Sequence, residues 1–159
     1  MKDPTLQAIG AGQAITGARF DGVIADDIIE KEDCSNQKRR EDMESWWNAV
    51  ILELLDEQGW ALMIGTRKHG DDLYERTRQK PTWSYQIDKA IIKYPSQYEF
   101  VTEPDENGIP KLVGIKHTGD GQVLAPDMWS MEKMLEKKLE NATTPWVFDR
   151  EQQQEVTEE

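Results

Sequence analysis

Two short apolar runs flank one long amphipathic segment in the first half of the chain, and this order constrains the fold most strongly. The first run, Gly22-Val23-Ile24-Ala25, ends at Asp26, and the second, Trp60-Ala61-Leu62-Met63-Ile64, ends at Gly65-Thr66-Arg67. Between them, apolar residues from Met43 to Leu55 recur in steps of three and one, which is typical of one stripe of an α-helix. A strand, a helix and a strand in this order predict a β-α-β unit with two parallel strands.

The predicted helix runs from about residue 36 to residue 58. Ser35 or Asn36 can supply the N-cap, and Gly59 stands where a C-terminal glycine is expected. The strands on either side are apolar without alternation, which is typical of parallel strands covered on both faces. The unit is therefore expected to form part of an α/β fold with a parallel sheet core.

Polar residues follow both predicted strands and form the main candidate site. Because parallel strands end at the same edge of a sheet, Asp26 and Asp27 are expected to lie on the same side as Thr66, Arg67 and His69. Asp26 suits a Mg²⁺ ligand of the Walker B type, and an acid directly after it could act as a general base. Thr66 and Arg67 could contact a γ-phosphate through a hydroxyl and a guanidinium.

Two other interpretations of these residues stay open. In a structural one, the aspartate caps the next turn, Thr66 ends its strand and Arg67 pairs with Asp71 or Asp72. In another, carboxylates and one histidine hold one or two metals for hydrolysis. The set for such a centre is Asp26, Asp27, His69, Asp71 and Asp72.

The glycines near the N-terminus only partly match a phosphate-binding loop. Gly12 and Gly17 have the required spacing, but Ala18-Arg19 stands where Lys and Ser or Thr are needed. These glycines are interpreted as residues of a turn or of the entry to the first strand.

Weaker patterns predict the rest of the chain. A short helix is expected to reach Arg78, and residues 83–88 alternate as a strand that leads into residues 90–92. Residues 94–122 predict short strands and turns, and residues 128–141 predict a helix. The Gln- and Glu-rich end, residues 151–159, is expected to fray unless it docks on a missing partner domain.

Composition excludes several classes of protein. A chain of 159 residues suits one domain with a real core, and it contains no apolar run near the length of a membrane span and no signal-peptide pattern. The single Cys34 cannot form an internal disulfide, which favours a reducing, cytoplasmic setting. The formal net charge of −12 argues against binding of a nucleic-acid backbone by this chain alone.

Residues 8–78 resemble the large terminase subunit of tailed bacteriophages, the ATP-driven motor that packages DNA into the prohead. The stretches that carry the resemblance are Thr16 to Asp21, Val23 to Ile29, Ser35, Arg39 or Arg40, Trp46-Trp47, and Ala61 to Leu73. Weaker similarity returns at Val123 to Ser130 and at Phe148 to Gln154.

The resemblance implies a fold and site roles. The fold is a partial P-loop (ASCE-type) ATPase without the Walker A strand, loop and helix. Residues 1–141 are the C-terminal half of the ATPase domain, and residues 142–159 are a linker or tail towards a missing nuclease domain. Asp26 is implied as the Walker B aspartate, and Thr66, followed by Arg67, as part of the coupling motif. Asp27 lies near the catalytic carboxylate, for which Glu30 or Glu32 are possible substitutes.

The resemblance also implies cofactors and partners. In the intact protein these are ATP and Mg²⁺, the remaining ATPase and nuclease parts, the portal protein, the small terminase subunit and double-stranded DNA. The setting is the host cytoplasm during virion assembly, and the isolated chain is expected to be inactive. The alternative is a non-catalytic interaction module, or a truncated relic, that docks on a separately encoded ATPase half.

Overall fold

The computed structural model describes residues 6–13, 15, 17 and 19–156, which form mixed α/β structure with three small two-stranded sheets. The chain divides into two compact units, Met1–Tyr85 and Gln86–Glu159, and each has its own hydrophobic core. Within the described residues, no helix is long and apolar enough to cross a membrane.

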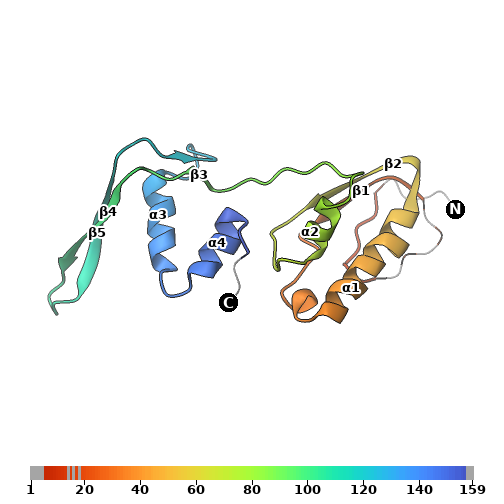
Figure 1. Cartoon of the computed structure of the whole chain (residues 1–159), viewed down its shortest axis with the longest axis horizontal. Coiled ribbons are helices and arrows are strands. Elements are labelled where there is room, and N and C mark those ends of the chain that lie inside the picture. The colour runs from red at the N-terminus through yellow and green to blue at the C-terminus, as the bar shows by residue number, and fades with distance from the viewer. Residues whose placement is uncertain (1–5, 14, 16, 18, 157–159) are drawn as a thin grey trace. The chain divides into compact units, whose positions relative to one another are not determined.

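The first unit contains the predicted pair of parallel strands. Strand β1, Phe20–Asp26, lies beside β2, Leu55–Ile64, with Val23 opposite Ala61 and Asp26 opposite Ile64. The chain crosses from one strand to the other through helix α1, Gln37–Trp46, as Figure 1 shows. The predicted β-α-β order and the parallel direction are confirmed.

The predicted helical segment begins where expected but ends early. Asn36 is the N-cap, and its side chain accepts a hydrogen bond from the Arg39 backbone N–H. After α1 the chain forms a π-helical turn, Trp47–Ile51, and a 3₁₀ turn, Leu52–Leu54. Leu54 is the last buried apolar residue of the stripe, and Leu55 is already extended and pairs with Phe20 at the start of β2. The prediction of a helix to residue 58 with Gly59 at its end was wrong, because Gly59 lies inside β2.

The core of the first unit lies on one face of the β1–β2 sheet. Ala25 of β1 packs with Trp47, Ile51 and Leu54 from the crossover segment, and Leu73 joins them. Leu73 begins helix α2, Leu73–Arg78, which confirms the predicted short helix. In Figure 1, α1 and α2 lie on the same side of the two strands.

The other face of this sheet differs from the prediction. Strands covered on both faces were expected, but the described residues leave four large apolar side chains exposed there. They are Ile24, Trp60, Leu62 and Ile64. The helices of the first unit, α1 and α2, therefore do not cover the second face as they would in a typical parallel sheet.

The second unit is built from short antiparallel strands and two helices. Strand β3, Ile91–Lys93, pairs with β6, Gln122–Val123, and β4, Tyr98–Pro104, forms a hairpin with β5, Pro110–His117. Helix α3, Met131–Glu140, and helix α4, Pro145–Gln153, complete the unit. Its buried apolar residues are Ile91, Val123, Met131, Met134, Leu135 and Phe148.

Two parts of the second half differ from what the sequence patterns predicted. Residues 83–89 form neither helix nor strand, so the strand expected over residues 83–88 is absent. The segment expected as a linker or tail, residues 142–159, contains α4, and its Gln153 is buried. With its amide oriented so that nitrogen and oxygen each find a partner, Gln153 donates to the Ile91 carbonyl and accepts from the Ile91 N–H, each over 3.1 Å, which holds the end of α4 in its own unit. Residues 157–159, the end of the segment expected to fray, lie outside the described residues. The assignment of these residues to a terminase stays a prediction.

Candidate functional site

Three of the predicted site residues meet at the end of the parallel strands. Asp26 ends β1 opposite Ile64, and the Asp27 backbone N–H donates to the Ile64 carbonyl over 2.8 Å, which extends the ladder by one residue. The Thr66 backbone N–H donates to Oδ1 of Asp27 over 3.5 Å, a long hydrogen bond between residues 39 apart in sequence. The structure thus brings Asp26, Asp27 and Thr66 together as predicted.

Asp27 has an unusual backbone. Its φ of +46° lies in the left-handed region, where Asp is one of the few non-glycine residues found. This conformation turns the chain directly after β1 and presents the exposed Asp26 and Asp27 side chains at the sheet edge. Strained conformations of this kind occur often at functional sites.

Tyr74 is a residue of this edge that the sequence patterns missed. Its hydroxyl donates to the Ile64 carbonyl over 3.2 Å, and burial, followed by the charge of Asp27, raises its pKa. A Cβ atom at position 65 would lie 1.9 Å from the Tyr74 hydroxyl oxygen, so Gly65 is required for this approach. A glycine directly after an apolar strand is a signal of close packing that could have pointed to such a neighbour.

The side chains of Arg67 and His69 contact the loop that follows β2, and Arg67 also contacts α2. Arg67 forms an ion pair of 3.2 Å with Glu75, an acid that the structural interpretation did not name, and also donates to the Gly70 carbonyl. Nδ1 of His69 accepts from the Asp71 backbone N–H over 2.9 Å. The ion pair with Glu75 joins the loop to α2, and the other two contacts lie within the loop.

The acids after this loop have structural partners. Asp72 is buried and accepts hydrogen bonds from the backbone N–H groups of Lys68, His69 and Glu75, which caps α2. Asp71 pairs with the guanidinium groups of Arg40 and Arg76. Since both acids are occupied in this way, the five-residue hydrolytic metal centre is not assembled. Among the described residues, no group of three or more His, Cys, Asp or Glu could hold a metal ion.

The donors at the sheet edge fit a magnesium ion better than a metal fully ligated by protein. Asp26 and Asp27 offer exposed carboxylate oxygens, the hard ligands that Mg²⁺ prefers. Mg²⁺ commonly keeps several waters and uses one or two carboxylates together with substrate phosphates. The alternative acids Glu30 and Glu32 are exposed on the segment after β1, where Glu32 begins a short 3₁₀ helix, Glu32–Cys34.

The incomplete phosphate-loop pattern falls partly outside the described residues. Ala14, Thr16 and Ala18 of this pattern lie outside the described residues. Gly12 and Gly17 have φ values of +77° and +76°, which is typical of glycines in turns.

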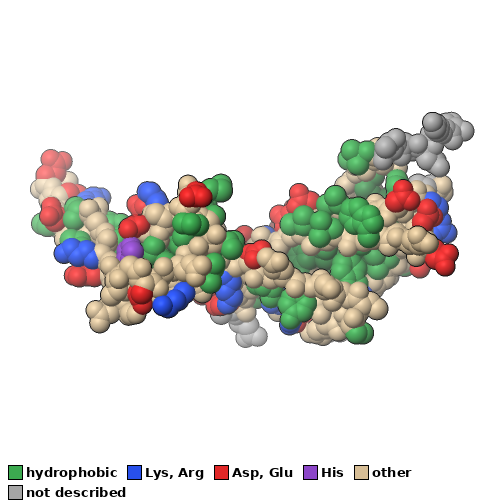
Figure 2. Space-filling model, turned by 90° about the horizontal axis from the view of Figure 1, so that it is seen from above, with side chains coloured by type: hydrophobic (Ala, Val, Ile, Leu, Met, Phe, Trp, Pro, Cys, Tyr) green, Lys and Arg blue, Asp and Glu red, His purple; other side chains and the backbone are tan. Residues whose placement is uncertain are grey.

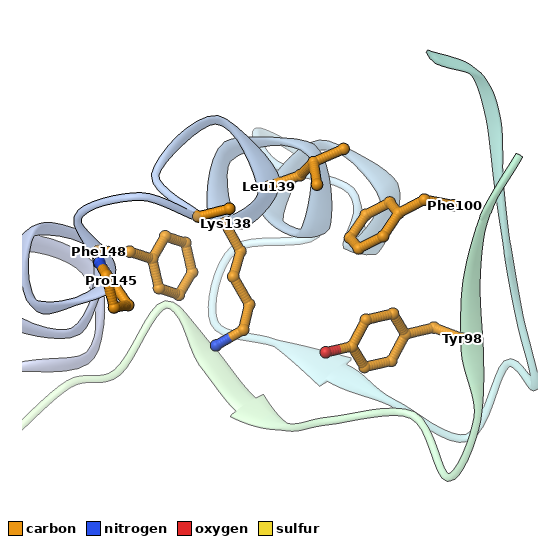
Figure 3. A pocket seen from close by; sticks show the side chains of 7 residues that line it. Tyr98, Phe100, Lys138, Leu139, Pro145 and Phe148 are labelled. Atoms are coloured by element: carbon orange, nitrogen blue, oxygen red, sulfur yellow. The ribbon is translucent and has the colours of Figure 1, made fainter. Parts of the chain in front are cut away.

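A separate small pocket lies in the second unit (Figure 3). Rings of β4 and α4 surround it, and Lys138 of α3 lies between them, with its ammonium 5.2 Å from the Phe148 ring centre. The lining residues are Tyr98, Phe100, Lys138, Leu139, Ala142, Pro145 and Phe148. Its volume of about 160 Å³ is below the roughly 300 Å³ at which typical ligand sites begin. It has room for about one ring and is too small for a nucleotide.

The chain matches no model of a known protein family, and no curated protein shows significant similarity to it. What the β1–β2 edge can do therefore depends on its own chemistry. That chemistry is two exposed carboxylates, of which Asp27 accepts a hydrogen bond from the backbone of Thr66, two residues after the end of β2.

Proposed function

We propose that this chain contributes the magnesium-binding and coupling half of the ATPase in a phage terminase large subunit, which drives double-stranded DNA into the prohead. The observation that supports this most is the contact between Asp27 and Thr66 at the common edge of two parallel strands. The resemblance of residues 8–78 to terminases suggests the family, and the edge supplies suitable chemistry in the expected place.

Each residue of the edge has a role in this proposal. ATP and Mg²⁺, when bound, supply the phosphoanhydride bond and the charge that polarises it. Asp26 would hold the metal with its exposed carboxylate, directly or through a water molecule. Asp27 orients the attacking water and can accept its proton. Because Asp27 is hydrogen-bonded to the backbone of Thr66, a shift of its carboxylate at hydrolysis would reach the exit of β2.

Parts beyond these 159 residues complete the motor in this proposal. The sequence contains no G-x-x-x-x-G-K-[ST] loop, so the groups that grip the β- and γ-phosphates come from elsewhere. The remaining ATPase and nuclease parts, the portal protein and the small terminase subunit are the proposed partners. With a net charge of −12, the chain meets DNA through the assembled motor in the host cytoplasm.

A second candidate is a non-catalytic interaction module that docks on a separately encoded ATPase half. The exposed apolar face of the β1–β2 sheet favours it, because such a face suits a binding surface. In this case Asp26 would be dispensable for function, whereas in the first candidate its loss would abolish ATP hydrolysis.

Manganese mapping by NMR tests the metal role in the chain as it exists. Mn²⁺, a paramagnetic substitute for Mg²⁺, is expected to broaden the amide signals of residues 26–27 and 65–66 of the ¹⁵N-labelled protein. Asp26→Asn should remove this broadening, because it removes the charged ligand. Asp88→Asn, which makes the same change at an exposed aspartate of the second unit, should preserve it. Broadening at the β1–β2 edge that persists in Asp26→Asn would contradict the proposed role.

A further inference from the structure

The uncovered face of the β1–β2 sheet carries large apolar side chains, and we call it the open face. The exposed fractions of its residues are 62% for Ile24, 53% for Trp60, 45% for Leu62 and 49% for Ile64. Figure 2 views the first unit from the side of this sheet and shows hydrophobic side chains gathered over the strands, with acidic side chains around them. An exposed patch with a polar rim is typical of an interaction site.

The strand register makes the open face one continuous strip. Gly22 lies opposite Trp60, and Ile24 opposite Leu62. The Trp60 ring covers Gly22, since a Cβ atom there would lie 2.3 Å from the ring. The next pair along the same face is Asp26 and Ile64. The strip therefore ends at the aspartate of the candidate site.

Carboxylates stand at both ends of this strip. Asp26 and Asp27 mark the end of β1, and Asp21 marks its start. Between the pairs Phe20–Leu55 and Gly22–Trp60 the register shifts, which places the extra β2 residues Asp56 and Glu57 at the same end as Asp21. All five acids are exposed. A binding partner would have to offer positive charge at both ends and apolar side chains between them.

This charge pattern disfavours a second copy as the occupant. Two copies packed through their open faces would bring acidic ends together, and each carries a net charge of −12. The secondary structure of the occupant follows from the sheet. Parallel strands are normally covered by helices on both faces, and α1 and α2 cover only one face here.

We propose that the open face binds an amphipathic helix of a partner protein, with one apolar stripe and Lys or Arg near both ends. The seven residues of β1 span about 20 Å at 3.3 Å per residue, which about 14 helical residues match at 1.5 Å each. Binding of such a helix does not require ATP hydrolysis, so it is compatible with either candidate function.

A synthetic peptide tests this proposal on the full chain. The probe is a helical peptide of about 16 residues with leucines on one face and two lysines at each end. A first control peptide has glutamates in place of the lysines, and a second has glutamines in place of the leucines. The lysine peptide should shift the amide signals of β1 and β2 and bind at least about tenfold more tightly than either control. Added salt should weaken its binding.

Variants of exposed residues locate the binding site. Ile24→Gln and Leu62→Gln should each weaken binding of the lysine peptide several-fold, and Asp26→Asn with Asp27→Asn should reduce its salt dependence. Val113→Gln is the matched control, because Val113 is 54% exposed on β5 in the second unit. Equal binding of the glutamate-ended peptide, or no effect of Leu62→Gln, would overturn the proposal. A dimer of the chain alone in sedimentation, dissolved by Leu62→Gln, would overturn it in favour of a second copy. Ile24 and Leu62 are not metal ligands in the proposed function. The peptide test can therefore fail while the manganese test succeeds, and the reverse.

Discussion

Gly65 and Tyr74 show how a single position shapes the candidate site. The Tyr74 hydroxyl occupies the space that a side chain at position 65 would need, and it donates to the carbonyl of Ile64 at the end of β2. Thr66 follows directly and donates to Asp27. The close approach of Tyr74 to the backbone at Gly65 therefore fixes the exit of β2 on which the Asp27 contact depends.

Gly65→Ala should destabilise the protein by about 1–3 kcal/mol, because the new methyl group overlaps the Tyr74 ring. In a Tyr74→Ala background the same change should cost much less, since the overlapping atoms are gone. Urea unfolding measures both differences. Gly70→Ala is the control: a Cβ there meets no atom within 4 Å, so its effect should stay within about 0.5 kcal/mol. Equal costs at positions 65 and 70 would show that Tyr74 does not constrain the edge.

For single residues of the candidate site, the sequence predicted those whose positions follow from the direction of the strands. Asp26, Asp27 and Thr66 come together because two parallel strands end at one edge. Tyr74 and the left-handed conformation of Asp27 depend on the path of loops, which no residue pattern encoded. The partner of Arg67 was missed for the same reason, because Glu75 approaches it only once α2 has folded back.

Among the elements, partly buried charges join α1 to α2 and to the loop before α2. Arg76 of α2 donates to Glu44 of α1 and to Asp71, and Arg40 of α1 also donates to Asp71. Hydrogen bonds from Arg76, and then from Arg40, lower the pKa of Asp71 to about 2. Arg78, then Gln79, lower the pKa of Glu75 to about 2. The network holds the crossover helix against the loop that follows β2.

These shifts predict loss of stability in acid. In the unfolded chain both carboxyls have pKa values of about 4, above their folded values. They therefore stabilise the fold above about pH 4, and this contribution disappears as the pH falls towards 2. The urea midpoint should fall across that range. Arg76→Gln should lower the midpoint at neutral pH and make its decline in acid shallower. Lys38→Gln, which breaks the exposed ion pair with Asp42 on α1, should leave the fall of the urea midpoint with pH as it is in the wild type. The same fall in Arg76→Gln as in the wild type would contradict the role of the network.

The elements themselves were predictable where apolar spacing was clear. The β-α-β unit and α3 follow from such spacing, and the end of the crossover helix does not. Gly59 resembles a C-terminal glycine in sequence, but Leu55 is already extended and pairs with Phe20. An apolar strand also does not reveal whether both of its faces are covered, and only the structure identifies the open face.

Across the whole molecule, the chain folds as two units with separate cores, described as Met1–Tyr85 and Gln86–Glu159. No glycine- or proline-rich linker marks this boundary, and the alternating residues 83–88 predicted a strand across it. The second unit is defined by contacts between residues far apart in sequence, such as Gln153 and Ile91. Such contacts cannot be predicted from local residue patterns. The candidate site and the open face both belong to the β1–β2 sheet of the first unit. One partner could therefore cover the open face and add groups to the candidate site.

Reconstitution of ATP hydrolysis tests the proposed function most directly. The chain is combined with a separately encoded protein that carries a Walker A loop, sought first in the adjacent upstream reading frame, and Mg²⁺-dependent phosphate release is measured. Hydrolysis is expected only with both chains present. Asp26→Asn should reduce it by at least about a hundredfold, and Asp88→Asn should leave it unchanged. Full activity of the Asp26→Asn mixture, or hydrolysis by the isolated chain that Asp26→Asn abolishes, would contradict the account.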